Sequence, residues 1–239
     1  MLSLGAYGML RFPVTLLGRH ADGTIQILLL LIGLLSQWYG GVLSLAATDI
    51  KRLVAYSSVS QMGYVLFAVA TLTPLGMAGA IFHIIGHGLL KATMFMAVGL
   101  VIKGTGHRNL ADLGGLRSAM PWASLALLVG ALGMAGMPPL VGFHSEWMML
   151  GGGLASAYPW LGIAAFVSPL LTAGYGLRLV ARVALGTKPD GLTVQAVPRS
   201  MRWSTMAMSC LALITGVLPG VLYGWAQDAA AVLNLGGAL

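Results

Sequence analysis

One stretch of the sequence, residues 75–103, is apolar and long enough to cross a lipid bilayer as a helix, yet its middle carries three ionisable side chains. His83, His87 and Lys91 follow one another at intervals of four residues, so a helix places them along one face. An ionisable group at the centre of a bilayer costs about 2.5–3.5 kcal/mol on insertion scales. We therefore expect this face to point into a helix bundle or a wet cavity and not toward lipid.

The composition predicts a polytopic membrane protein. Hydrophobic residues make up 58% of the 239 residues and charged residues only 8%, against about 25% charged residues in a soluble domain. The net charge of +7 does not predict nucleic-acid binding, because basic residues of a membrane protein gather in its cytoplasmic loops. The single Cys210 excludes an internal disulfide. Met1 leads straight into an apolar segment, so we expect no cleaved signal peptide.

Seven apolar segments predict about seven transmembrane helices in a single membrane domain that covers residues 1–239. The expected spans are residues 2–18, 24–47, 53–72, 75–103, 121–156, 160–185 and 203–225. The fifth span is too long for one straight helix. Pro138 and Pro139 remove two backbone donors from its middle, so we expect the helix to break there. Three glycines add flexibility around the break: Gly133, Gly136 and Gly142.

Basic residues are distributed unequally over the connections between these spans. The odd-numbered connections carry only Arg19. The second, fourth and sixth connections carry Lys51, Arg52, Lys103, Arg108, Arg117, Arg182, Lys188, Arg199 and Arg202. Because basic loops stay in the cytoplasm, we expect the N-terminus to be cytoplasmic and the C-terminus to lie outside.

His83, His87 and Lys91 are the strongest candidates for a functional site. Imidazole titrates near neutral pH and an amine can exchange protons, so these groups could carry protons along the helix if water links them. Direct transfer between rigid neighbours is excluded, because one helical turn is about 5.4 Å long. Three titratable groups on one stripe favour this relay over a role as polar contacts between helices. A metal site is not expected, because the two histidines lack a further ligand.

Glu146 is the one carboxylate within an apolar segment, and it follows the expected helix break. The proton affinity of a buried carboxylate depends on nearby charges, so a moving neighbour could switch it. A carboxylate there could equally cap free amides at the start of the next helix. His144 lies two residues earlier, on another face of the helix, where it could gate an exit or be held by a hydrogen bond.

Lys51 and Arg52 follow Asp49 at the end of the second span. Anchoring at the cytoplasmic surface explains Arg52, whereas spacing alone leaves Lys51 open between anchoring and proton transfer. The next residues offer a polar lining suited to water or to contacts between helices, with Tyr56, Ser57, Ser58, Ser60, Gln61 and Tyr64. The sequence has no dinucleotide-binding glycine motif, cysteine cluster or nucleophile elbow. We therefore expect no cofactor and no redox or hydrolytic chemistry in this chain.

Three motifs occur in order along the chain: ATDIKRLVAYSSVSQMGY, IFHIIGHGLLK and GMPPLVGFHSEW. With them the chain closely resembles the antiporter-like membrane subunits of respiratory complex I, which are related to Mrp-type cation/proton antiporters and to energy-converting hydrogenases. Members of this family are built from two inverted five-helix repeats, each with a broken helix. The resemblance implies that this chain holds the second repeat with flanking helices, and that GMPPLVGFHSE is its broken helix.

The resemblance also implies a role for each candidate residue. Lys51 and Lys91 match the relay lysines of the family, and His83 and His87 match its central histidines. Glu146 falls where the family places a terminal lysine or glutamate at the exit side of the half-channel. That glutamate resembles the M-type subunit, whereas Lys91 resembles the L-type, so the subtype stays open. One departure is Ser3, which stands where M-type subunits often have a lysine.

The function implied is movement of protons, or of sodium ions, through a half-channel coupled to the redox reaction of partner subunits. The expected host is a complex I-like NADH:quinone oxidoreductase, or an Mrp or hydrogenase assembly, in a bacterial or archaeal cytoplasmic membrane. The first repeat is not part of this sequence, so either a second polypeptide supplies it, or this chain conducts through a partner, or it does not pump. The alternatives are a scaffold subunit that does not pump and the C-terminal half of a split antiporter subunit. An autonomous antiporter is less favoured, because one repeat has no internal partner to move against.

Overall fold

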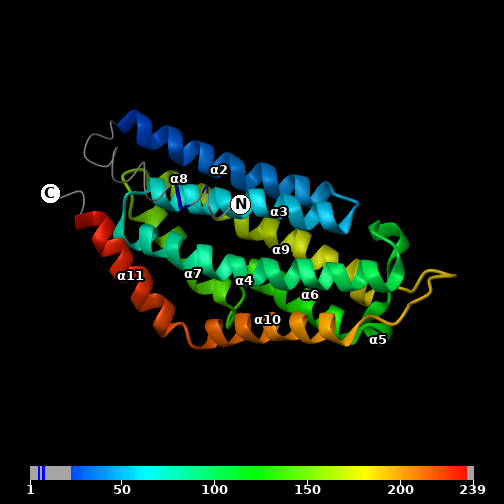
Figure 1. Ribbon diagram of the computed structural model, residues 1–239. Helices are drawn as coiled ribbons and strands as arrows, with labels where there is room; N and C mark the ends of the chain where they lie inside the picture. The colour runs from blue at the N-terminus through cyan, green and yellow to red at the C-terminus, as the bar shows by residue number, and fades with distance from the viewer. Residues whose placement is uncertain (1–4, 6, 9–22, 236–239) are drawn as a thin grey trace.

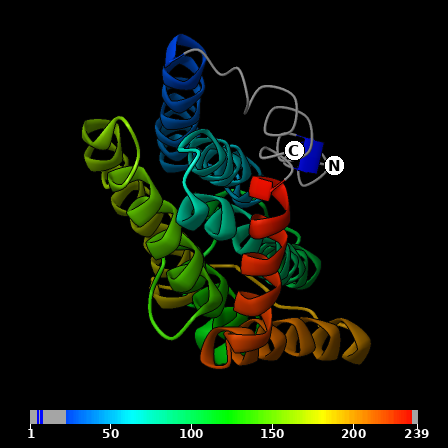
Figure 2. The same ribbon diagram turned by 90° about the vertical axis from the view of Figure 1, so that its left-hand side faces the viewer.

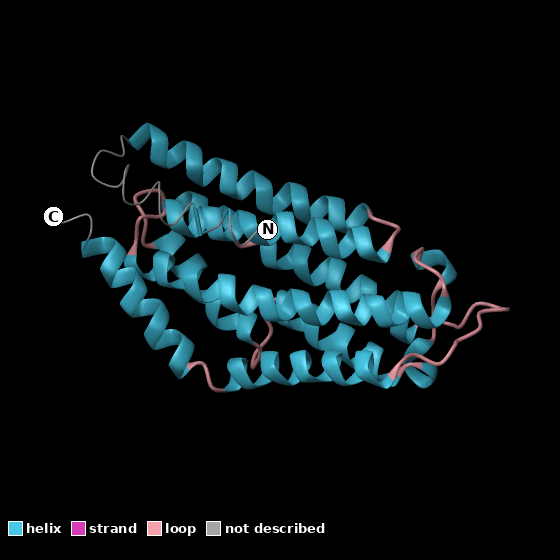
Figure 3. Ribbon diagram, in the orientation of Figure 1, coloured by secondary structure: helices cyan, strands magenta, loops and turns pink. Residues whose placement is uncertain are grey.

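The computed structural model describes residues 5, 7–8 and 23–235, and every element there is a helix (Figure 3). The elements are α2 (Gly23–Ala46), α3 (Ile50–Ala70), α4 (Pro74–Thr105), η2 (Leu110–Asp112), α5 (Leu116–Ala119), α6 (Pro121–Met134), α7 (Val141–Leu154), α8 (Pro159–Ala165), α9 (Val167–Val180), the π-helical turn η3 (Ala181–Leu185), α10 (Arg199–Val217) and α11 (Gly220–Leu235). The prediction of an all-helical membrane protein is confirmed. The predicted first span, residues 2–18, lies almost entirely outside the described residues.

Helix α4 lies at the centre of the bundle (Figure 1). It packs against α3, α6, α7, α10 and α11. Helix α2 packs on the outer side of α3 and also contacts α9, while α11 crosses the bundle obliquely on the opposite side (Figure 2). The helix that carries three ionisable residues is therefore in contact with five other helices.

Within the described residues, four helical segments are long and apolar enough to cross a membrane. They are Gly23–Ala46, Ile50–Ala70, Pro74–Thr105 and the continuous segment Pro159–Leu185. A fifth is reached if the bent pair α10 and α11 counts as one span. Helix α6 is apolar but shorter than these segments. The number of seven spans stays a prediction.

The expected break near Pro138 and Pro139 is present: α6 ends at Met134 and α7 begins at Val141. Gly136 takes a left-handed backbone with φ of 66° at this break, a conformation that only glycine adopts readily. The other two glycines act differently from the prediction. A Cβ on Gly142 would overlap the carbonyl oxygen of Gly133, so this pair lets two backbones touch and does not supply flexibility.

The prediction of one continuous helix over residues 203–225 is wrong. Helix α10 ends at Val217, and α11 starts at Gly220 after a bend of 71°. Pro219 explains this, because a proline disfavours the helical conformation of the residue before it. Leu218 accordingly has φ of −119° and ψ of 66°.

Small residues set the distance between α2 and α3. A Cβ on Gly33 would lie 2.7 Å from the backbone nitrogen of Phe67, and one on Gly63 would lie 2.6 Å from that of Gln37. A Cβ on Gly40 would overlap the backbone of Ser60. Close backbone contact over small residues is how helices associate when no water is left to be displaced.

Asp49 fixes the start of α3. Its Oδ1 accepts hydrogen bonds from the backbone N–H groups of Lys51 (2.8 Å) and Arg52 (3.0 Å), as expected of a helix N-cap. Its Oδ2 lies 2.7 Å from the Arg108 guanidinium group. Partial burial raises the pKa of Asp49, but the two amide donors and the charge of Arg108 outweigh it, so the pKa lies below its usual value. This corner joins the start of α3 to the end of α4.

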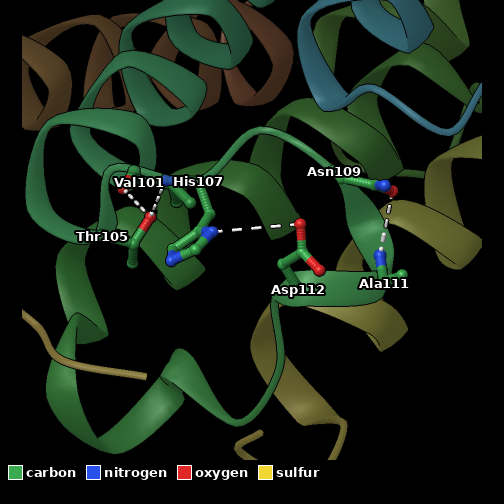
Figure 4. A network of polar contacts seen from close by, with 6 residues as sticks. All are labelled: Val101, Thr105, His107, Asn109, Ala111 and Asp112. Atoms are coloured by element: carbon green, nitrogen blue, oxygen red, sulfur yellow. Dashed lines mark hydrogen bonds and ion pairs between the residues drawn. The ribbon is translucent and has the colours of Figure 1, made fainter. Parts of the chain in front are cut away.

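The end of α4 is closed by local polar contacts (Figure 4). Gly106 takes a left-handed conformation with φ of 76°, and its N–H donates to the Ile102 carbonyl. Thr105 Oγ1 donates to the Val101 carbonyl at 2.8 Å and accepts from the His107 N–H at 3.2 Å. The His107 ring lies 3.9 Å from the Asp112 carboxylate, and both are about half exposed.

The contact between Gly133 and Gly142 yields a test. We expect Gly142→Ala to lower the free energy of unfolding by about 1–3 kcal/mol, because the added methyl group has no room against a backbone carbonyl. The measurement is the thermal unfolding midpoint of the purified protein in detergent. Gly88→Ala is the matched control, because a Cβ on Gly88 of α4 meets nothing within 4 Å. Equal midpoints for the two variants would contradict this account of the helix break.

Candidate functional site

The candidate site lies inside the bundle, between α3, α4, α7 and α9. His83, His87 and Lys91 on α4 are 2%, 5% and 7% exposed, and Glu146 on α7 is 4% exposed. Their burial agrees with the expectation that these groups point away from lipid. Their use as proton carriers stays a prediction.

Lys91 is held by helix α3. Its Nζ donates to the Val54 carbonyl at 2.8 Å and to the Ser57 hydroxyl. The Ser57 hydroxyl also lies 3.0 Å from the Val54 carbonyl. An amine buried in a low-dielectric interior needs such acceptors, since a charge without partners there is costly. The contact partners of Lys91 thus come from α3, not from the two histidines on its own helix.

The two histidines lie side by side on α4, with ring centroids 5.7 Å apart. His83 Nδ1 is 2.9 Å from the Ser145 hydroxyl, which itself donates to the Gly142 carbonyl at 2.9 Å. A hydroxyl has one hydrogen, so this arrangement assigns the hydrogen of the His83 contact to Nδ1. His83 Nε2 and His87 Nδ1 have no hydrogen-bond partner within the described chain.

Glu146 follows the helix break and lies against it. A Cβ on Gly136 would lie 2.5 Å from Glu146 Oε2, so the left-handed glycine makes space for the carboxyl group. Gln61 of α3 lies beside this carboxyl group, and its Nε2 is 3.4 Å from the Met134 carbonyl at the end of α6. The break therefore positions Glu146 deep in the bundle.

Two buried tyrosines lie close to Glu146. Tyr64 lies near Glu146 and stacks on His83 with a centroid distance of 6.2 Å. Tyr175 of α9 lies near Glu146, Gln61 and Ser57. Neither tyrosine hydroxyl has a hydrogen-bond partner within the described chain. Buried polar side chains thus lie on α3, α4 and α9 between Lys91 and Glu146, but no hydrogen bond within the described residues links His83, His87 and Tyr64 to one another.

A further polar cluster lies where α2, α3 and α9 meet. Ser168 donates to Gln37 Oε1 at 2.6 Å, and Ser60 donates to the Gln37 backbone carbonyl at 2.8 Å. Thr172 donates to the Ser168 carbonyl at 3.1 Å and lies near Tyr64. Gln37, Ser60, Ser168 and Thr172 are all fully buried. The sequence analysis missed Gln37, Ser168, Thr172 and Tyr175, although a single polar residue inside an apolar helix is itself a signal of an interior position.

Lys51 is not brought together with the other candidates. Its side chain is exposed at the first turn of α3, as is that of Arg52, while Lys91 contacts the same helix one turn further on, at Val54. The proposed role of Lys51 stays a prediction. Within the described residues, no three His, Cys, Asp or Glu side chains gather at one place.

His144 joins the two interrupted helices of the fold. It is half-buried, and its Nε2 donates to the Gly216 carbonyl at 2.9 Å, in the last turn of α10. Gly216 itself packs on the break between α6 and α7: a Cβ there would lie 2.6 Å from the Val141 nitrogen and would overlap the Pro139 carbonyl. The gating role of His144 stays a prediction, and its observed contact is a structural one.

Ionisable groups enclosed at the centre of a helical bundle are typical of membrane proteins that move ions. Residues 1–172 match the family described as "NADH:quinone oxidoreductase/Mrp antiporter, TM". The chain belongs to this family of antiporter-like membrane subunits.

Individual relatives agree with this assignment. The chain is 32% identical over 238 residues to F(420)H(2) dehydrogenase subunit M of Methanosarcina mazei, covering 98% of this chain and 48% of that protein. A chain of respiratory complex I from Thermus thermophilus is similar with a TM-score of 0.85 and 29% identity, over 96% of this chain and 49% of that one. A chain of the Mrp complex from Dietzia sp. DQ12-45-1b shares the fold, with a TM-score of 0.87 and 20% identity over 97% of this chain and 51% of that one. The chain spans about half the length of these relatives.

The contact between Ser168 and Gln37 can be tested by a double-mutant cycle. We expect Ser168→Ala to lower the free energy of unfolding by about 1–3 kcal/mol, because it leaves the buried Gln37 Oε1 without its donor. Adding Gln37→Leu restores part of the loss, because both partners are then apolar. Thermal midpoints in detergent measure the effect.

The matched control for this cycle is Ser204→Ala, which changes an exposed serine on α10. A loss in Ser168→Ala no larger than that in the control, or strict additivity of the two substitutions, would argue against a buried polar cluster.

Proposed function

We propose that this chain provides a proton-conducting half-channel of an antiporter-like membrane subunit, with Lys91, His87, His83 and Glu146 as its proton carriers. The observation that carries the proposal is the series of buried polar side chains that lies between Lys91 and Glu146. Groups of this kind are expensive at membrane depth and are typical of ion pathways. Sodium is the alternative ion, and oxygen ligands around a carboxylate would be its preferred site.

Proton transfer along α4 requires intermediate carriers. The centroid distance of 5.7 Å between His83 and His87 exceeds the donor–acceptor distance of about 2.7–3.2 Å in a hydrogen bond. Water, or rotation of one imidazole ring, would have to bridge the gap. His83 Nε2 and His87 Nδ1 are suited to this, because neither is engaged by another protein group in the described structure. Tyr64 offers the hydroxyl that would continue the line from His83 to Glu146.

Coupling would follow from electrostatics in the low-dielectric interior. Like charges repel and opposite charges attract each other far more strongly there than in water. A proton that arrives at His87 would repel the charge of Lys91, and Glu146 would attract the proton onward. A change of charge in a partner subunit could thus drive movement along the line, and the groups would titrate as a coupled set.

The location and partners follow from the family. We infer that the chain works inside a multi-subunit assembly of the complex I, Mrp or hydrogenase type in a bacterial or archaeal cytoplasmic membrane. The α2–α3 connection, the end of α4, helix α5 and the connection before α10 all lie at one end of the bundle (Figure 1). These segments hold the basic residues of the even-numbered connections, so we place this end in the cytoplasm.

Substitution of the proposed carriers tests the function. We expect Lys91→Ala and Glu146→Gln each to lower proton flux about 100-fold or more, as removal of a proton-transfer group typically does. The measurement is a pH-sensitive dye in sealed membrane vesicles that hold the chain in its native complex. The control is Lys103→Ala, which removes an exposed lysine from the last turn of the same helix. Unchanged flux in both carrier variants would leave the scaffold role as the better account.

A second variant tests whether conduction depends on the position of the Glu146 carboxyl group and not only on its presence. Gly136→Ala places a methyl group against the Glu146 carboxyl group, and we expect it to reduce proton flux while the complex stays assembled. Gly106→Ala imposes the same left-handed strain, costing about 1 kcal/mol, but meets nothing within 4 Å. Equal flux in the two glycine variants would mean that the geometry of Glu146 is not important for conduction.

A further inference from the structure

A hollow of about 450 Å³ lies at the start of α6, between this helix, α5 and the end of α9. Arg117, Trp122 and Ser124 line its polar part, and Leu125, Leu128 and Val180 line its apolar part. We propose that this hollow binds one anionic phospholipid, with the headgroup at Arg117 and the start of α6 and an acyl chain along the leucines. This proposal does not depend on proton conduction.

The headgroup end is electropositive and has free hydrogen-bond donors. Arg117 is exposed and makes no hydrogen bond or ion pair within the described residues. Helix α6 begins at Pro121, which has no N–H, without a side-chain cap at Met120. The Ser124 N–H is engaged by the Met120 carbonyl, so the first-turn donors left for a ligand are the amides of Trp122 and Ala123. The first turn of a helix carries a partial positive charge and binds anions such as phosphate.

Ser124 supplies an independent observation. It is 7% exposed and lines the hollow, yet its buried hydroxyl has no hydrogen-bond partner within the described chain. A buried hydroxyl normally has one. A phosphate or ester oxygen in the hollow would accept from this hydroxyl.

The apolar part runs away from the headgroup end in the direction of the membrane. Leu125 and Leu128 are 48% and 37% exposed and lie one turn apart on α6, beside Val180 of α9. Trp122, which is 49% exposed, lines the hollow near its polar part, and tryptophans are enriched at membrane interfaces. The hollow thus has the polarity of a phospholipid, with a charged end and an apolar groove.

Charge favours an anionic lipid over a zwitterionic one. A second hollow of about 240 Å³ shares Pro121 and Trp122 with the first and includes Arg202. The basic connections lie at this end of the bundle. Basic protein segments near a membrane are attracted more strongly to anionic lipids than to zwitterionic lipids. An apolar wall of this extent also favours a lipid over free phosphate.

The test uses quenching of Trp122 fluorescence by lipids with brominated acyl chains. The native complex is reconstituted in phosphatidylcholine vesicles with increasing brominated phosphatidylglycerol or brominated phosphatidylcholine. The Trp122 signal is the difference between wild type and Trp122→Phe. We expect brominated phosphatidylglycerol to quench half of this signal at a mole fraction about fivefold lower than brominated phosphatidylcholine needs. A fivefold preference is about what the attraction of one basic residue to an anionic membrane surface provides.

Substitutions decide whether Arg117 and Ser124 cause this preference. Arg117→Gln should remove most of it, and Ser124→Ala should weaken it. Arg52→Gln, which removes an exposed arginine of α3 that does not line the hollow, should leave it unchanged. Three results would overturn the proposal: equal quenching by both lipids, absence of quenching by either, or the full preference in Arg117→Gln. Relief of quenching by added inorganic phosphate would assign the site to a free anion instead.

Discussion

The cost of placing ionisable groups at membrane depth governs this structure. Lys91, His87, His83 and Glu146 cannot face lipid, and each must find polar neighbours inside the bundle. Helix α4 accordingly lies among five other helices, and Lys91 finds its acceptors on α3. The remaining helices form the enclosure that these four groups require. The helices of the bundle thus keep four ionisable side chains away from lipid.

The interruption between α6 and α7 is the second element of that solution. A continuous helix would carry its side chains past the centre of the bundle at a fixed rotation. Because of the break, α7 begins at Val141 with an orientation that α6 does not dictate. Glu146 then lies beside Gln61, and Gly136 leaves room for its carboxyl group. Close contact between Gly133 and Gly142 then locks the two halves together.

Local sequence signals predicted much of the fold. The helical class, the break at Pro138–Pro139 and the interior position of the face that carries His83 follow from hydropathy, proline chemistry and four-residue spacing. Two other features depend on contacts between distant segments. The partners of Lys91 on α3 and the cluster around Gln37 and Ser168 could not be derived from spacing along any one helix.

The prediction of one continuous helix over residues 203–225 failed although the sequence contains a local signal against it. Pro219 indicates that α10 ends just before it, but the prediction was based on hydropathy alone. Hydropathy reports whether a segment is apolar and says nothing about whether its axis is straight. The flexible role given to Gly133 and Gly142 failed for a different reason. A glycine that allows close approach and one that allows bending look the same in a sequence, and only the packing distinguishes them.

The two interruptions of the chain lie against each other, since Gly216 packs on the residues after Pro139 and its carbonyl accepts from His144. Each interruption thereby shields backbone groups that the other exposes. A displacement of one interruption would therefore disturb the other, although more than 70 residues of sequence separate His144 from Gly216.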